Sequence, residues 1–166
     1  MSERPIRFGF TGGASSKRAK LLESARLVEQ LGYSTFGLAD HFVRPFAPLI
    51  AGMAVADATT TLRITQTVLA QDFREPAVLA KELATLDVLS EGRLQVGLGA
   101  GWLRQEYEDA SMRFDSAAVR IERLRRRRSS CAVCSAPSRS ASTASTTGST
   151  TSPARPSRTS DQGRRS

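Results

Sequence analysis

Hydrophobic positions at the start of the chain alternate over a short run and then take a helical spacing. Ile6, Phe8 and Phe10 alternate with other residues, which is typical of a strand. The run after them has an apolar helical face at Leu21, Leu22, Ala25, Val28 and Leu31. Serines at 15–16 can cap this helix, and Gly32 is expected to end it.

This strand-then-helix unit recurs along the chain. Further strands are predicted at residues 34–39, 62–69 and 94–98, and further helices at residues 48–58 and from Pro76 to just before Gly92. The strand centres lie about 30 residues apart, which is the length of a βαβ unit. The pattern therefore predicts an α/β fold with a parallel sheet and right-handed crossovers.

Two architectures fit four such units: an open doubly wound sheet, or the first half of a (β/α)8 barrel. In the barrel, functional groups gather just after the carboxyl ends of the strands. The polar and glycine-rich segments of this chain fall in those places, at residues 40–41, 71–74 and 97–102. We therefore expect the functional site at that edge of the sheet.

The glycines after the fourth predicted strand do not form a dinucleotide-binding fingerprint. Gly97 and Gly99 fit its first two positions, but the third falls on Trp102. No phosphate-binding GxxxxGK[ST] motif is present either. A nicotinamide-dependent Rossmann enzyme is therefore disfavoured.

The composition changes abruptly at residue 124. Beyond it, 18 of the 42 residues are Ser or Thr, and Leu, Ile, Met, Phe, Tyr and Trp are absent. Such a segment cannot bury enough apolar surface to offset the entropy lost on ordering. The sequence therefore predicts a folded part over residues 1–124 and a disordered, basic, low-complexity tail over residues 125–166.

The net charge of +8 comes entirely from this tail. Residues 1–124 hold 15 basic and 15 acidic side chains, whereas residues 125–166 hold nine arginines and a single acidic residue, Asp161. We interpret the tail as a frameshift product. A nucleic-acid-binding arm is the alternative, and it is disfavoured because the tail has no aromatic side chain on which a base could stack.

The sequence gives no sign of a metal site or of a membrane segment. Cys131 and Cys134 form a lone CxxC pair, and the single histidine, His41, lies far away in the sequence. No apolar run approaches the roughly 18 to 20 residues that cross a membrane, and no apolar stretch follows the N-terminus. We expect a cytoplasmic protein without a metal.

Four segments, taken together and in order, resemble the luciferase-like flavin and deazaflavin oxidoreductases. They are residues 31–42 (LGYSTFGLADHF), 72–81 (DFREPAVLAK), 85–93 (TLDVLSEGR) and 97–102 (GLGAGW) with Glu106 and Tyr107. The form of the last segment is most similar to the branch that uses the deazaflavin coenzyme F-420, and FMN-dependent monooxygenases are the alternative. The resemblance implies a (β/α)8 TIM barrel of which this chain holds the first four units. It also implies a parent enzyme that pairs as a homodimer and acts on a small organic substrate.

The resemblance also implies roles for particular residues. It puts Asp40 near the edge of the deazaflavin ring and makes His41 the acid–base group, which suits imidazole because its unperturbed pKa lies nearest neutrality. The alternative is that His41 only caps the strand end through Asp40. Thr67 and Val68 match a strand end where the family often has a non-proline cis peptide against the ring. The backbone at Gly97, Gly99, Ala100 and Gly101 is implied to approach the cofactor closely.

Two departures from the family pattern change the expected activity. In the branch that oxidises sugar phosphates, a glutamate follows the fourth strand as proton partner; Ala100 stands there in this chain, and Glu106 comes several residues later. A sugar phosphate substrate is therefore not expected. The family binds the phosphate tail of the cofactor with the second half of the barrel, so we expect this chain alone to have little or no activity.

Overall fold

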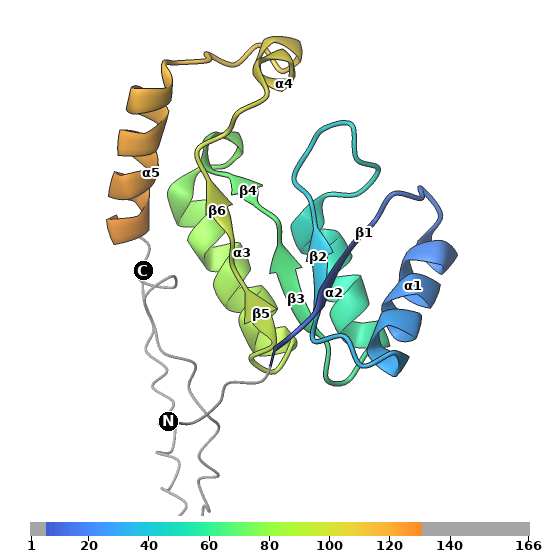
Figure 1. Cartoon of the computed structure of the whole chain (residues 1–166). Helices are drawn as coiled ribbons and strands as arrows, with labels where there is room; N and C mark the ends of the chain where they lie inside the picture. The colour runs from blue at the N-terminus through green and yellow to red at the C-terminus, as the bar shows by residue number, and fades with distance from the viewer. Residues whose placement is uncertain (1–5, 131–166) are drawn as a thin grey trace, which may run out of the picture.

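A parallel sheet with helices on a single face makes up the computed structural model, which describes residues 6–130. The sheet has the order β1-β2-β3-β5, and the strands are β1 (Gly9–Gly12), β2 (Thr35–Leu38), β3 (Arg63–Gln66) and β5 (Leu94–Gln95). A second parallel pair joins β4 (Leu69–Ala70) to β6 (Leu98–Gly99). The helices α2 (Pro48–Ala58) and α3 (Pro76–Leu89) lie behind the strands, and α1 (Arg18–Gln30) lies beside β1 (Figure 1) and shares a core with α2.

This arrangement matches the barrel alternative. Neighbouring strands follow one another in chain order, and right-handed crossovers between them place every connecting helix on the same side of the sheet. A doubly wound sheet would carry helices on both faces. The strands point toward the top of Figure 1, where the β2–α2 loop and helix α4 (Arg104–Asp109) lie.

The two faces of the sheet differ in chemistry because side chains alternate along each strand. One row of paired residues, Phe10, Phe36, Ile64 and Leu94, is apolar. The next row, Thr11, Gly37, Thr65 and Gln95, is small or polar. Phe36 and Ile64 are fully buried in the core formed with α1 and α2, while Gln95 is exposed. The sheet therefore buries its apolar side under the helices and leaves a polar side open.

The strands are shorter than the sequence pattern predicts. Strand β1 starts only at Gly9, where its pairing with Thr35 begins, and Ile6 and Phe8, which continue the alternation, lie outside it and are exposed. The predicted third strand is divided into β3 and β4 at the Thr67–Val68 peptide bond, which is cis as the family resemblance implied. The predicted fourth strand is likewise divided into β5 and β6.

The helices agree with the prediction more closely. Helix α2 has the predicted bounds, and α1 ends before Gly32, which has a positive φ of 78°. The expected serine cap is displaced, since Lys17 is the N-cap residue and its backbone N–H donates to Ser15 Oγ at 3.3 Å.

Helix α5 (Ala117–Ser130) continues across residue 124, where the composition changes. The rest of the predicted tail, with the Cys131–Cys134 pair, lies outside the described residues. Within residues 6–130, no helix combines the length and apolar character needed to cross a membrane.

Arg93 joins the ends of two helices at the amino-terminal edge of the sheet. Its guanidinium donates to the carbonyl oxygens of Ala56 at 2.8 Å and Thr59 at 3.1 Å, at the end of α2. Its Nε donates to the Ser90 carbonyl oxygen at 2.9 Å, just after α3. Because carbonyl groups at helix ends lack partners within the helix, this one side chain satisfies acceptors of both.

Glu29 of α1 organises the turn that leads into β3. Its carboxylate accepts hydrogen bonds from the backbone N–H groups of Thr60 at 2.9 Å, Thr61 at 2.6 Å and Leu62 at 3.0 Å. Burial alone would raise the pKa of this carboxyl group, but the hydrogen bonds from Thr61, Thr60 and Leu62 together lower it below its usual value. The ionised form of Glu29 is therefore the form that the fold stabilises.

We predict that Glu29→Gln lowers the free energy of unfolding by about 1 kcal/mol at neutral pH, because it replaces the charged acceptor of three N–H groups with a neutral amide. The folded-state pKa is depressed, so the stabilisation is present above the unfolded-state pKa and is lost as the pH falls through the lower folded-state value. Urea unfolding at several pH values should thus show the difference shrinking in acid. Glu23→Gln, at an exposed ion pair with Lys20 on the same helix, is the control and should change little.

Candidate active site

A cavity of about 210 Å³ lies at the carboxyl edge of the sheet. Seven of the eight residues predicted for the site line it: Asp40, His41, Thr67, Val68, Gly99, Ala100 and Gly101. Gly97, the eighth, is not part of the lining. The structure thus brings together the ends of the second, third and fourth predicted strands, as expected for a barrel edge.

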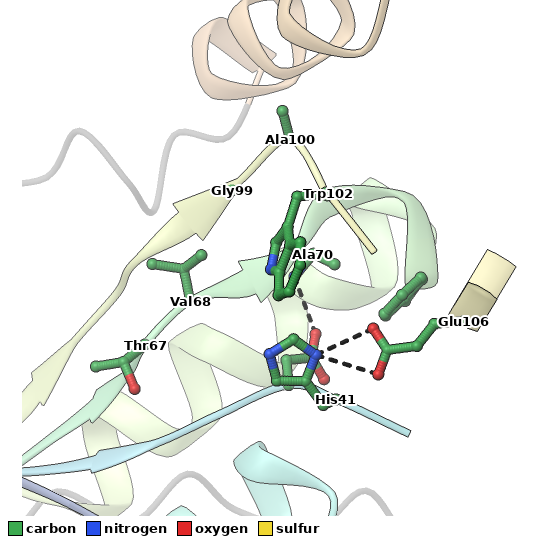
Figure 2. Close-up of a pocket in the computed structure, with 11 residues that line it drawn as sticks. His41, Thr67, Val68, Ala70, Gly99, Ala100, Trp102 and Glu106 are labelled. Carbon is green, nitrogen blue, oxygen red and sulfur yellow. Dashed lines mark hydrogen bonds and ion pairs between the residues drawn. The ribbon is translucent and has the colours of Figure 1, made fainter. Parts of the chain in front are cut away.

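His41 is held by a buried carboxylate that the sequence analysis did not assign to the site. Its Nδ1 lies 3.0 and 3.1 Å from the two carboxylate oxygens of Glu106. Glu106 also accepts the backbone N–H of Phe42 at 2.9 Å, and its side chain is only 6% exposed. Because a carboxylate can only accept, Nδ1 carries the hydrogen. The other ring nitrogen, Nε2, faces away from Glu106 on the side of Thr67 and Val68 (Figure 2).

This arrangement leaves His41 ready to exchange a proton at one defined atom. With Nδ1 occupied by Glu106, Nε2 has a free lone pair in the neutral ring and a hydrogen in the protonated ring. The edge of the His41 ring also meets Trp102, with ring centroids 6.0 Å apart and an interplanar angle of 85°. The side chain of His41 is bound to Glu106, whereas the alternative in which it only caps the strand end requires a bond to Asp40.

Asp40 lines the cavity, but its carboxylate is bound to protein groups. Arg74 donates Nη1 to Oδ2 at 2.6 Å and Nη2 to Oδ1 at 2.8 Å, and the Ala70 N–H donates to Oδ2 at 3.0 Å. The hydrogen bond to Asp40 raises the pKa of Arg74 above its ordinary value, despite partial burial. Asp40 therefore fixes β4 and the short 3-10 turn η1 (Gln71–Phe73) behind the cavity. A contact with a cofactor ring stays a prediction.

A third buried carboxylate, Asp72, lies next to Tyr107. The Tyr107 hydroxyl donates to Asp72 Oδ2 at 3.3 Å. Burial, together with the charge of Asp72, raises the pKa of Tyr107 to about 12, so the phenol keeps its proton at neutral pH. Tyr107 follows Glu106 directly in α4, and its ring is fully buried.

Two aromatic side chains, Phe73 and Trp102, line the cavity, and further aromatic side chains pack behind Phe73. Phe42 stacks on Phe73 with centroids 4.5 Å apart, and Phe73 packs on Tyr107 at 5.3 Å. Val68 and Trp102 are 49% and 71% exposed and both line the cavity, so they present apolar surface to whatever occupies it. Such walls suit a flat ring system better than a charged group.

The glycines of the fourth predicted strand allow a close approach within the protein itself. A Cβ atom at Gly97 would overlap the carbonyl oxygen of Gln66, and one at Gly99 would lie 2.5 Å from Val68 Cγ2. These two positions need glycine so that the β5–β6 segment can lie against the Thr67–Val68 junction. The implied approach of the backbone to a cofactor remains a prediction for Gly99, Ala100 and Gly101, which reach the cavity.

Gly101 faces a further steric demand. Its φ is +77°, and an added Cβ atom would overlap the Tyr107 hydroxyl. Gly92 has nearly the same φ, +76°, but has nothing within 4 Å of an added Cβ atom. Gly92 therefore requires glycine for its backbone conformation alone, whereas Gly101 requires it both for its conformation and for the space that Tyr107 occupies.

We predict that Gly92→Ala costs about 1 kcal/mol of unfolding free energy, for the positive φ alone. Gly101→Ala should cost about 2 kcal/mol more, because Tyr107 must also move. Equilibrium unfolding in urea measures both values. Equal costs for the two substitutions would show that the loop adapts around Tyr107 freely.

Comparison with known proteins assigns the chain to a family. The family model described as luciferase-like monooxygenase matches residues 5–155. The F-420-dependent glucose-6-phosphate dehydrogenase of Kribbella flavida is 33% identical over 131 residues, which cover 72% of this chain and 39% of that protein. The uncharacterized protein y4vJ of Sinorhizobium fredii is 29% identical over 113 residues, 66% of this chain and 32% of that protein. The chain spans about a third to two fifths of the length of these relatives.

Solved structures agree on the fold. The F-420-dependent tetrahydromethanopterin reductase from Methanopyrus kandleri has a TM-score of 0.64 at 20% identity, covering 74% of this chain and 39% of that one. EDTA monooxygenase from Chelativorans sp. has a TM-score of 0.69 at 17% identity, covering 75% and 36%. The oxygenating component of 3,6-diketocamphane monooxygenase from Pseudomonas putida, in complex with FMN, has a TM-score of 0.62 at 19% identity, covering 72% and 37%. The parallel sheet with helices on one face thus matches part of the fold of these enzymes, and the chain belongs to the luciferase-like monooxygenase family.

Proposed function

We propose that this chain carries the proton-transfer side of an oxidoreductase site in which hydride passes between the deazaflavin coenzyme F-420 and an organic substrate. The observation that carries the proposal is the His41–Glu106 pair, which leaves Nε2 of His41 free beside the cavity. When bound, F-420 would accept or donate the hydride, which carries two electrons. The F-420-dependent relatives support this choice of cofactor.

The residues of the chain provide what hydride chemistry needs besides the cofactor. Oxidation of an alcohol carbon requires its hydroxyl group to lose a proton, and Nε2 of His41 can accept it. In the reverse direction, the protonated ring donates from the same atom to a carbonyl oxygen. Glu106 keeps the other ring nitrogen protonated and stabilises the imidazolium while it carries the charge.

The cavity fits the ring of such a cofactor and not its tail. Its volume of about 210 Å³ is below the roughly 300–1,000 Å³ of complete ligand pockets. Its walls at Val68, Phe73 and Trp102 are apolar, and among the described residues no Lys or Arg lines it. A charged phosphate tail therefore has to bind to groups other than these.

The residues that line the cavity also indicate which kind of substrate it can bind. The family resemblance implies the glutamate of the sugar-phosphate branch at Ala100, which has only a methyl group, and among the described residues no Lys or Arg lines the cavity to bind a phosphate. We therefore propose an uncharged alcohol or carbonyl compound as the substrate. We also propose that the chain alone turns over slowly or not at all, because it spans only part of the length of its relatives.

An FMN-dependent monooxygenase is the second candidate. The apolar walls suit an isoalloxazine as well as a deazaflavin, and one structural neighbour is a complex with FMN. The two candidates differ chemically, since reduced flavin reacts readily with oxygen and the reduced deazaflavin does not. Binding selectivity separates them without requiring turnover.

The single tryptophan makes binding measurable, because Trp102 lines the cavity. We predict that oxidised F-420 quenches Trp102 fluorescence saturably and with a lower Kd than FMN, and that NAD gives no saturable signal. Trp102→Phe, which removes the reporter, is the control for inner-filter effects. Tighter binding of FMN would favour the monooxygenase, and no saturable quenching by either compound would contradict a ring site at this cavity.

We further propose that the protein pairs with a second copy through α2 and α3. Between them lies an apolar groove of about 580 Å³, lined by Leu49, Ile50, Met53, Leu86 and Leu89. Ile50 in this groove is 77% exposed. The groove is also lined by the basic side chain of Lys81 and by the acidic side chain of Asp57. A second copy turned by a two-fold axis can cover the apolar surface and pair Lys81 with the partner's Asp57.

Light scattering coupled to size exclusion tests this pairing. We predict a dimer for the wild-type chain and a monomer for Ile50→Asp, because the substitution places a charge in the apolar contact. Ile121→Asp, at an exposed isoleucine of α5, is the matched control and should remain dimeric. A wild-type chain that is monomeric at every concentration would refute the proposal.

A further inference from the structure

Helix α5 is attached to the rest of the protein mainly by arginines. Arg120, Arg123 and Arg127 are spaced at i, i+3 and i+7, which places them on one face of the helix. By contrast, the aliphatic side chains of Val119 and Ile121 are exposed. Hydrogen bonds from arginine side chains therefore connect α5 to the segments around the candidate site.

Two of these arginines bind the backbone of segments that build the site. Arg120 donates Nε to the carbonyl oxygen of Gly101 at 3.3 Å, and its guanidinium lies 3.9 Å from the centroid of the Phe114 ring. Arg127 donates to the carbonyl oxygen of Gln71 and, at 3.2 Å, to that of Arg74. Helix α5 thus contacts both the end of the β6 segment and the η1 turn.

The third arginine, Arg123, neutralises a buried charge. It donates Nη1 to Asp72 Oδ1 at 2.7 Å, and Nη2 to the carboxylate of Asp115. The Asp72 side chain is only 4% exposed, so its charge requires a partner inside the protein. These hydrogen bonds also raise the pKa of Arg123 above its ordinary value.

Asp72 connects Arg123 to the residues that hold His41. Its second oxygen accepts the hydroxyl of Tyr107, which is fully buried. Tyr107 lies in the middle of α4, directly after Glu106. Its position therefore helps to set where the Glu106 carboxylate lies. Glu106 in turn binds Nδ1 of His41. A continuous series of contacts therefore runs from α5 to the imidazole.

We propose that Arg123 is a positioning residue for the proton-transfer pair. By neutralising Asp72 it fixes the Tyr107 hydroxyl, and through Tyr107 it holds Glu106 where His41 must keep its hydrogen on Nδ1. The catalytic importance of the pair rests on the proposed function, but the positioning does not. If Arg123 contributed to stability alone, its replacement would leave the tautomer of His41 unchanged.

The single histidine of the chain makes this difference measurable. Nitrogen NMR of labelled protein, recorded at a pH well above the ordinary pKa of histidine and without any cofactor, reports which ring nitrogen carries the hydrogen. The wild-type chain should show a protonated Nδ1 and a bare Nε2. Arg123→Met should shift the ring toward the other tautomer, whereas Arg123→Lys, which keeps the charge, should restore much of the wild-type spectrum.

Two further variants make the result decisive. Arg126→Met makes the same change on the same helix, at an arginine that pairs with Glu122 on the exposed side, and should leave His41 unaltered. Tyr107→Phe keeps the buried ring but removes the hydroxyl, and should perturb the tautomer even if Arg123→Met does not fold. A wild-type His41 spectrum in either folded Arg123→Met or Tyr107→Phe would overturn the proposal. Because no cofactor is present, this outcome is independent of whether F-420 binds.

Discussion

Three carboxylates buried at the carboxyl edge of the sheet impose the geometry on which the candidate site depends. A buried charge is unfavourable unless an opposite charge or hydrogen-bond donors compensate it. The pairs are Glu106 with His41, Asp40 with Arg74, and Asp72 with Arg123. Each pair joins segments that are distant in the sequence. Satisfying the three carboxylates therefore brings the β2 end, the η1 turn, α4 and α5 together around one cavity, and it leaves little freedom in how the His41 ring is oriented.

Hydrophobic spacing predicted the order and type of the elements up to the fourth strand, because the apolar side of the sheet and the inner faces of the helices bury the same periodic positions. Helix α2 was predicted with its observed bounds, since Pro48 fixes its first turn. The strand ends were predicted less well. Phe8 continues the alternation of β1 without being buried, and the fourth strand is divided near Gly97, where close packing on Gln66 decides the backbone path. Both outcomes depend on tertiary contacts that alternation does not encode.

The position of the site followed from topology, because the carboxyl ends of neighbouring parallel strands converge whatever their sequence. The interactions within it did not. Glu106 lies 65 residues from His41, and an acidic residue in the first turn of a helix is also favoured by the helix dipole alone. The sequence signals for Glu106 were its place after the glycine-rich end of the fourth strand and its part in the family resemblance, and neither indicates His41 as its partner. The ion pair of Asp40 with Arg74 and the packing of Gly97 against Gln66 were likewise not predicted, while the contacts of these residues with a cofactor stay predictions.

Helix α5 shows why composition and structure define different boundaries. The four consecutive arginines from residue 125 suggest a solvated tail, yet the helical spacing returns Arg127 to the face that already carries Arg120 and Arg123. There Arg127 binds the carbonyl oxygen of Arg74, whose side chain holds Asp40 beside the cavity. An arginine can dock a helix in this way because its long side chain brings several donors to carbonyl and carboxylate groups that an aliphatic side chain could not satisfy. The support of the candidate site therefore extends past residue 124, into the segment that the composition assigned to the tail.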